Sequence, residues 1–302
     1  MTEVTTINPS YGTTRTVTRQ QPVIEKQAED KFETVLFLPE GEARQGEGGL
    51  RTQGYFKANL EGKPLITVVT AVLNGEKFLE ETIQSVINQT YDNVEYIIID
   101  GGSTDDTLDI IRKYEYAIDY WVSEKDKGTY DAMNKGIQLA IGKAISLINS
   151  DDFYYDNSVL KVLLDKWDLC FFDICFSNMI FIDAYTRAVL EERSANINKI
   201  YFGMYLNHPS VFVQRSHYKK IGMFDFPRFK LAADYDFILR SKVSGASFYY
   251  LKENMTYMRD GGISIQNYNE TLSETKKARE KNISYLMLKL TNFIKWIKGA
   301  FK

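Results

Sequence analysis

Apolar stretches of strand length alternate with helical patterns between residues 65 and 148, and this alternation limits the fold more than any other feature. The stretch at 65–73 is continuously apolar or β-branched, as in strands that are buried on both faces. A helical pattern at 76–88 leads to a second stretch at 96–99, which ends at Asp100. Because strands that alternate with helices form βαβ units, the sequence predicts a parallel, doubly wound α/β sheet flanked by helices.

The alternation continues through patterns at 107–114, 118–122 and 144–148 and reaches residue 152. A chain of 302 residues, of which 44% are hydrophobic, can bury one large core with appendages and is too short for three domains. We therefore expect one catalytic domain with extensions at its ends.

Composition changes sharply before this core. Residues 1–31 are rich in Thr, Gln and charged side chains without periodicity, which predicts a disordered arm. Residues 32–63 combine a short apolar piece, 35–38, with a glycine-rich region from 41 to 54. We expect the apolar residues of 32–63 to dock on the main domain.

Charge, cysteine and histidine content exclude several classes of protein. A formal net charge of −3 and an isoelectric point near 5.7 provide no basic field for nucleic acid. The only cysteines, Cys170 and Cys175, and the only histidines, His208 and His217, do not form a zinc-ligand pattern. The polar start lacks the apolar core of a signal peptide, and no stretch of 18 apolar residues exists, so we expect a cytoplasmic protein with reduced thiols.

Three groups of carboxylates follow or interrupt apolar stretches: Asp100, the pair Asp151 and Asp152, and the pair Asp234 and Asp236. Open α/β sheets bind ligands at the carboxyl ends of their strands, so the first two groups predict a crevice lined with hard oxygen ligands. Such a crevice suits a metal-bound phosphate. The alternatives are that Asp151 and Asp152 form a solvated turn and that Asp100 caps the helix after it. Neither a dinucleotide fingerprint nor a P-loop is present, so a phosphate ligand must be held differently.

Five segments resemble, in order and spacing, the motifs of family 2 glycosyltransferases of the bacterial surface-polysaccharide type. They are ITVVTAVLN at 66–74, SVINQTY at 85–91, IDGGSTD at 99–105, GTYDAMNKG at 128–136 and NSDD at 149–152. The resemblance implies a GT-A fold, with a Rossmann-like, mostly parallel sheet over residues 64–265. It divides this domain into a nucleotide-sugar half, 64–152, and an acceptor half, 153–265.

The resemblance also implies roles for individual residues. Asp152 is the expected metal ligand and holds Mg²⁺ or Mn²⁺ on the donor diphosphate, while Asp151 faces the ribose or the metal shell. The expected nucleotide-sugar site contains Ala71, Leu73, Asp100, Gly101, Lys127 and Asp151.

The acceptor half resembles the family at 208–213, 221–225 and 232–237. An aspartate at the position of Asp234 is the general base in this family, because inverting transfer needs a carboxylate to take the proton of the acceptor hydroxyl. The alternative for Asp234 is an exposed acid at a helix start. His208 is either a satisfied core histidine or an acceptor contact, and Asp236 is a second acceptor-side candidate.

Two departures from the family pattern affect the predicted contacts with the nucleotide-sugar donor. Many members have two acids where this chain has Asp100 and Gly101, and an aromatic residue where it has Leu73, so a UDP-sugar is only the default donor. Members often carry an arginine before the asparagine that corresponds to Asn134. In this chain the charge for the phosphates is expected from Lys127 or Lys135.

The last segment, 266–302, predicts further helix, and aromatic and aliphatic residues alternate with lysines at 283–302. This pattern suits an amphipathic helix at the surface of a membrane, and the alternative is a helix that packs on the domain or on a second subunit. The expected location is therefore the cytoplasm, with peripheral attachment to the inner face of the cell membrane as an extension.

The function predicted from these features is metal-dependent, inverting transfer of a sugar from a nucleotide-sugar to a glycan or lipid-linked saccharide. Two alternatives stay open at this point. A nucleotidyltransferase would also need strand-end acids and a metal, but it favours basic residues in its first loop, and 73–76 has none. A sugar-nucleotide binding or scaffold protein would not need Asp234 as a base.

Overall fold

The computed structural model describes residues 3–41, 43–167, 172–284, 291 and 294. In this part of the chain a ten-stranded sheet has the order β1-β4-β3-β2-β5-β9-β7-β10-β6, and β8 pairs with β7 outside this path. The strands are β1 (Gly46–Gly48), β2 (Ile66–Val72), β3 (Val94–Asp100), β4 (Tyr120–Ser123), β5 (Ala144–Leu147), β6 (Phe153–Tyr154), β7 (Ile174–Ile182), β8 (Val189–Arg193), β9 (Val211–Gln214) and β10 (Phe248–Arg259).

The strands β4, β3, β2 and β5 are parallel neighbours, as the alternating sequence pattern predicts. Every residue of β2 and of β3 is buried, which is why these segments read as unbroken apolar runs. Beyond β5 the pairing changes, because β9 runs antiparallel to both β5 and β7, whereas β10 is parallel to β7. The predicted α/β class is confirmed.

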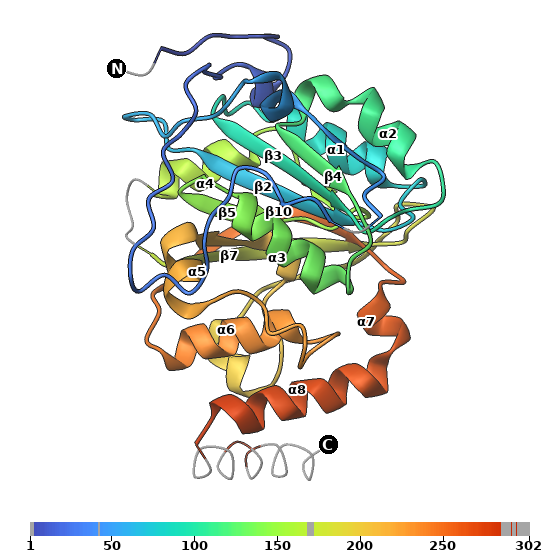
Figure 1. Ribbon diagram of the computed structural model, residues 1–302. Helices are drawn as coiled ribbons and strands as arrows, with labels where there is room; N and C mark the ends of the chain where they lie inside the picture. Colours follow the sequence, from blue (N-terminus) through green and yellow to red (C-terminus); the bar gives the residue numbers. More distant parts are fainter. Residues whose placement is uncertain (1–2, 42, 168–171, 285–290, 292–293, 295–302) are drawn as a thin grey trace.

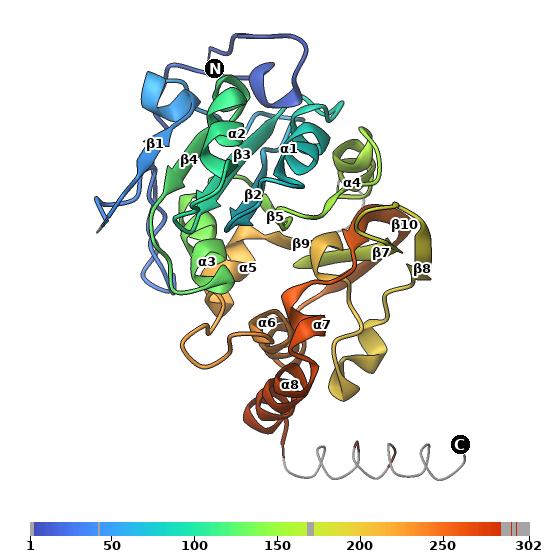
Figure 2. The same ribbon diagram turned by 90° about the vertical axis from the view of Figure 1, so that its right-hand side faces the viewer.

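Helices cover both faces of the sheet (Figures 1 and 2). One face carries α1 (Leu79–Ile87), α2 (Thr107–Lys113) and α4 (Val159–Trp167). The other carries α3 (Thr129–Leu139), α5 (Arg215–Ile221) and α6 (Ala233–Val243). After β10 come α7 (Ile263–Gln266) and α8 (Tyr268–Asn282), and α8 packs on α6. Short 3-10 helices occupy Gly12–Thr14, Leu50–Gln53, Glu115–Ala117, Ile197–Phe202 and His208–Ser210.

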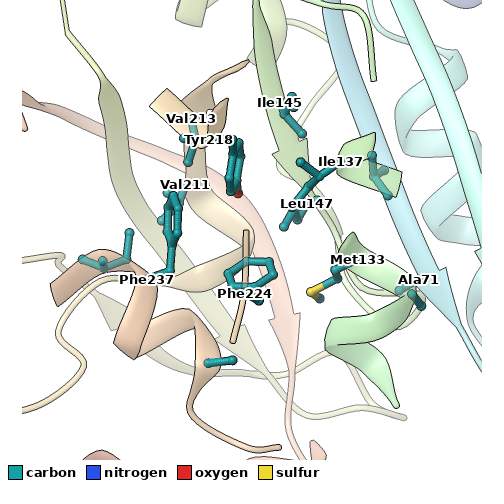
Figure 3. Close-up of a cluster of buried hydrophobic side chains, with 14 of the residues drawn as sticks. Ala71, Met133, Ile137, Ile145, Leu147, Val211, Val213, Tyr218, Phe224 and Phe237 are labelled. Carbon is teal, nitrogen blue, oxygen red and sulfur yellow. The ribbon is translucent and has the colours of Figure 1, made fainter. Parts of the chain in front are cut away.

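Two hydrophobic clusters fill these layers because neighbouring residues of a strand point to opposite faces. Val68 of β2 joins the cluster under α1, whereas Val69 joins the cluster under α3. Figure 3 shows the α3 side, where Leu147 of β5 lies among side chains of α3, β9 and α6. This cluster reaches the helices that carry the acceptor-half motifs.

The N-terminal residues 3–31 differ from the disordered arm that their composition predicts. Val17 is 1% exposed, and bridges join Thr5 to Val17 and Thr18 to Phe56. The buried ammonium of Lys57 donates to the carbonyl of Thr16 at 3.1 Å. Polar contacts of this kind leave no apolar period in the sequence, so composition alone misses them.

Residues 32–63 form part of the same body. Gly46–Gly48 is β1 and pairs antiparallel with β4 at the edge of the sheet. In the interior the Arg51 guanidinium is 2.6 Å from Oε1 of Glu95, and Oε2 of Glu95 accepts the hydroxyl of Thr67 at 2.6 Å. The extension therefore contributes both a strand and a buried ion pair.

The predicted interfacial helix at 283–302 lies almost wholly outside the described residues. Within the described residues, no helix has the length and apolar character that crossing a bilayer requires.

A substitution at Gly136 tests the contact between α3 and the sheet. A Cβ at this helix position would overlap Cγ1 of Val69 on β2. Gly136→Ala should therefore lower the free energy of unfolding by about 1–3 kcal/mol through overpacking, although alanine favours an exposed helix by about 1 kcal/mol. Chemical denaturation measures the change. The double variant Val69→Ala, Gly136→Ala should lose less than the sum of the two single variants, and simple additivity would contradict the close contact.

Candidate functional site

Hydrogen bonds at one edge of the sheet join the loop after β2 to the loop after β3, and helix α1 to the loop after β5. The backbone N–H of Asn74 donates to the hydroxyl of Ser103 at 2.7 Å. The Thr82 hydroxyl donates to the carbonyls of Ser150 and Asp152 at 2.9 and 2.6 Å. The predicted strand-end acids therefore share one edge.

Asp100 is fully buried and organises the loop that follows β3. Its carboxylate accepts the backbone N–H groups of Gly102 and Ser103 at 3.2 and 3.0 Å, and also the hydroxyls of Ser103 and Ser123. Through these four hydrogen bonds the carboxylate shapes the loop and ties it to the end of β4.

Asp126 is an acid that the sequence reasoning missed, and it lies against Gly101. A Cβ on Gly101 would collide with Oδ2 of Asp126, so the glycine leaves room for that carboxylate. The other oxygen accepts the N–H of Gly128 at 2.8 Å, and burial raises the pKa of Asp126. Its position shortly after the strand that ends at Ser123 was the available signal, since Asp100 likewise lies at a strand end.

The other predicted nucleotide-site residues differ in exposure. Ala71 is buried under α3 near Met133 (Figure 3), whereas Leu73 is 58% exposed. Lys127 is also exposed, in the loop between β4 and α3. Lys135 is instead paired with Glu124 at 2.8 Å, whereas Lys127 forms no ion pair with the described residues.

The adjacent acids after β5 have different surroundings. Asp152 is 1% exposed, and its two oxygens accept the side-chain amide of Asn149 at 2.9 Å and the N–H of Arg259 at 3.3 Å. The carboxylate of Asp151 is half-buried and has no hydrogen-bond partner from another residue within the described chain. The Arg259 guanidinium donates to the carbonyl of Asp151.

This pair fits a cation. Burial raises the pKa of Asp151, and burial together with the Asp151 carboxylate raises the pKa of Asp152 well above its ordinary value. A divalent cation would relieve the cost of two neighbouring buried carboxylates. No group of three or more Asp, Glu, His or Cys among the described residues could hold a metal, so substrate and water oxygens would complete the shell, as Mg²⁺ prefers.

Asp234 lies in the first turn of α6 and receives a hydrogen bond from across the domain. Its Oδ1 accepts the hydroxyl of Tyr130 on α3 at 2.9 Å and the backbone N–H of Tyr235 at 2.8 Å. Its Oδ2 is 3.9 Å from Nδ1 of His208. The structure thus brings Asp234 and His208 together, and it adds Tyr130, which the sequence reasoning did not single out as a site residue.

His208 is largely buried beside a small cavity that also reaches Asp234. Burial lowers the pKa of His208 and the Asp234 carboxylate opposes this, so the ring is favoured in its neutral form. Its Nε2 is buried without a hydrogen-bond partner among the described residues. The cavity is lined by Leu147, Met204, His208, Val211, Val213, Tyr218, Phe224, Asp234, Phe237 and Ile238, several of which appear in Figure 3.

Asp236 does not face the acceptor side, contrary to the expectation from sequence. It is fully buried, and its carboxylate contacts Arg240 at 2.8 Å, Lys281 at 3.0 Å and Asn282 at 2.8 Å. Residues two apart on a helix are separated by about 200° around its axis, so Asp234 and Asp236 point to opposite sides. Asp236 therefore joins α6 to α8.

Residues 67–225, just over half of the chain, match the family described as glycosyl transferase family 2. A PGL/p-HBAD biosynthesis glycosyltransferase of Mycobacterium tuberculosis is 27% identical over 186 residues, which cover 59% of this chain and 69% of that protein. An uncharacterized glycosyltransferase of Methanocaldococcus jannaschii is 30% identical over 241 residues, which cover 75% of this chain and 79% of the relative.

Solved structures share the fold at low sequence identity. Staphylococcus aureus TarS 1–349 in complex with UDP has a TM-score of 0.55 at 19% identity, over 71% of this chain and 65% of that one. The mannosyltransferase PcManGT from Pyrobaculum calidifontis, in complex with GDP-Man and Mn²⁺, has a TM-score of 0.56 at 16% identity, over 72% of this chain and 63% of that one. The chain spans less than two thirds of either solved chain.

The buried contacts of Asp236 predict a structural effect for Asp236→Asn. The substitution leaves Arg240 and Lys281 without their buried counter-charge and should cost about 3 kcal/mol or more of unfolding free energy. Asp225→Asn is the matched control, because Asp225 contacts the same Lys281 at 2.9 Å but its side chain is 32% exposed. The control should cost about 1 kcal/mol or less in the same urea titration. Equal losses in the two variants would contradict the role assigned to Asp236.

Proposed function

The chain belongs to glycosyl transferase family 2 and has the GT-A fold, and we propose that it transfers a sugar, with inversion, from a nucleotide-sugar to a glycan or lipid-linked saccharide. One observation carries this proposal. Asp234, the candidate base, is hydrogen-bonded to Tyr130 in the first turn of α3, and the loop before that turn adjoins Gly101. A donor at the strand ends would therefore lie close to a carboxylate that can accept a proton.

The donor is proposed to be a nucleotide-sugar, with UDP as the default nucleotide. TarS has been solved with UDP and with UDP-GlcNAc, and the mannosyltransferase has been solved with GDP-Man and Mn²⁺. In this chain the exposed Leu73 offers an apolar surface for the base, and Lys127 offers charge for the phosphates. Asp100 ends and Gly101 follows the neighbouring strand β3, which pairs with β2 at Ala71 and Val72, and the carboxylate of Asp126 lies against Gly101.

For the metal we propose Asp151 as the direct ligand and Asp152 as its support. The family resemblance instead implies Asp152 as the ligand and has Asp151 face the ribose or the metal shell. The exchange is favoured because Asp152 already accepts hydrogen bonds from Asn149 and Arg259, whereas the Asp151 carboxylate has no such partner in the described chain. Mg²⁺ or Mn²⁺ at this position would neutralise the negative charge that develops on the leaving diphosphate.

In the proposed reaction, Asp234 takes the proton of the acceptor hydroxyl through Oδ2, the oxygen that faces His208. The acceptor oxygen forms a bond to the anomeric carbon while the bond from that carbon to the diphosphate oxygen breaks. The bonding pair leaves with the nucleoside diphosphate, so the sugar is inverted in one displacement. His208, favoured as neutral, lies beside the base and can hydrogen-bond an acceptor without adding charge.

The acceptor class is proposed from chemistry that the family shares, and surface-polysaccharide assembly is the proposed setting. The relative from Mycobacterium tuberculosis is named for PGL/p-HBAD biosynthesis. A lipid-linked acceptor would place the reaction at the inner face of the cell membrane, which agrees with the amphipathic pattern at 283–302.

The exchanged metal roles are tested by Asp151→Asn and Asp152→Asn. Asp152→Asn changes a supporting group and should weaken Mn²⁺-dependent donor binding about 10-fold. Asp151→Asn removes the ligand itself and should weaken that binding more. Calorimetric titration of UDP and GDP, with Mn²⁺ and with EDTA, measures both effects. The reverse order of the two variants would restore Asp152 as the ligand, and binding insensitive to EDTA would exclude the metal proposal.

The base is tested by Asp234→Asn together with a screen of nucleotide-sugars. This variant should bind the donor normally but lose about 100-fold or more in transfer rate, the scale expected when a general base is removed. Turnover of donor by the unaltered protein, with a saccharide acceptor, distinguishes an enzyme from a sugar-nucleotide binding protein. Near-normal transfer by Asp234→Asn would place the base elsewhere.

A further inference from the structure

The hydroxyl of Tyr130 is the only side-chain group within hydrogen-bond distance of Asp234 among the described residues, at 2.9 Å from Oδ1. Burial and the Asp234 carboxylate hold the pKa of Tyr130 well above its ordinary value, so the phenol stays protonated and acts as the donor. The Tyr130 ring lies 5.2 Å from that of Phe224, centre to centre, which restricts its motion. A phenol held in this way can fix the orientation of the carboxylate.

The two carboxylate oxygens of Asp234 differ in their hydrogen-bond partners. Oδ1 already accepts two hydrogen bonds, from Tyr130 and from the N–H of Tyr235. Oδ2 has no hydrogen-bond partner in the described part of the chain, and Nδ1 of His208 is 3.9 Å away from it. The contact with Tyr130 therefore directs Oδ2 toward the side of the cavity that His208 lines.

Tyr130 also connects the two halves of the domain. It lies two residues after Gly128, whose N–H is held by Asp126, the carboxylate that lies against Gly101. The Tyr130 hydroxyl contacts Asp234 on α6, which belongs to the acceptor half. A donor that orders the loop before α3 would thereby set the position of the base.

The segment before Asp234 is also held by α8. Glu274 of α8 accepts the backbone N–H groups of Lys230, Leu231 and Ala232 at 3.0, 2.8 and 3.0 Å. The backbone that leads into α6 is thus held by α8 through three hydrogen bonds. The Tyr130 hydroxyl lies 3.4 Å from the Leu231 carbonyl of this segment, but its shorter contact, 2.9 Å, is with Oδ1 of Asp234.

We propose that Tyr130 is a positioning residue that holds the Asp234 carboxylate, through Oδ1, in the orientation in which Oδ2 accepts the acceptor proton. This inference rests on the proposed function, because it assumes that Asp234 is the base. It goes further by assigning the orientation of the base to a residue of the nucleotide-sugar half.

Tyr130→Phe removes the hydroxyl alone and tests the inference. Since small misplacement of a reacting group costs up to about 100-fold, kcat for transfer should fall about 10- to 100-fold while the donor Kd stays within about twofold. Tyr235→Phe is the matched control. Tyr235 is a buried tyrosine on α6, and its hydroxyl donates to the carbonyl of Ile200 at 2.8 Å instead of to Asp234. The control should keep kcat within about threefold, and thermal unfolding of both variants shows whether each is folded.

A double-variant cycle separates positioning from a general loss of structure. In the Asp234→Asn background, Tyr130→Phe should lower the residual rate by no more than about twofold, because no base is left to orient. A full additional loss in that background, or equal effects of Tyr130→Phe and Tyr235→Phe on kcat, would overturn the inference. If Asp234→Asn itself transfers normally, the proposed base is wrong. If only Tyr130→Phe is normal, the base stands and the positioning role is wrong.

Discussion

The central strands β2 and β3 have no side that faces water, since every residue of Ile66–Val72 and Val94–Asp100 is buried. Each strand must therefore be covered on both faces, and the helices that provide this cover return the chain in the parallel direction. All loops that leave the parallel strands at their carboxyl ends then emerge at one edge. Asp100, Asp126 and Asp151 lie at that edge because of the way the core is buried.

Burial and hydrogen-bond partners, more than residue type, determine which carboxylates stabilise the fold and which can bind a ligand. Asp100, Asp152 and Asp236 are surrounded by donors or cations of the protein itself, so their oxygens stabilise loops and helices. Asp151 and Asp234 each keep at least one oxygen without a partner in the described chain. A carboxylate can bind a metal or a proton only through an oxygen that folding has left available.

The interior near the N-terminal extension depends on polar contacts. Lys57 is fully buried beside Asp119 at 4.0 Å and donates to the carbonyl of Thr16 in the N-terminal segment. Burial raises the pKa of Asp119 to about 7, although the Lys57 ammonium opposes this effect. Because an unpaired buried charge is costly, the N-terminal segment that supplies the Thr16 carbonyl is an integral part of the domain.

Local pattern by itself determined the alternation of strands and helices and the placing of acids at strand ends, because two-sided burial leaves unbroken apolar runs that end abruptly. Asp234 as the candidate base came from the family resemblance, because its local pattern alone also fits an exposed acid at a helix start. Only the tertiary structure decided that Asp236 points away from Asp234, that Asp152 is enclosed whereas Asp151 is not, and that Tyr130 reaches Asp234 from another helix. The reason is physical: which carboxylate oxygen stays free depends on partners such as Lys281 and Arg259, which are distant in sequence and meet these acids only when the chain is folded.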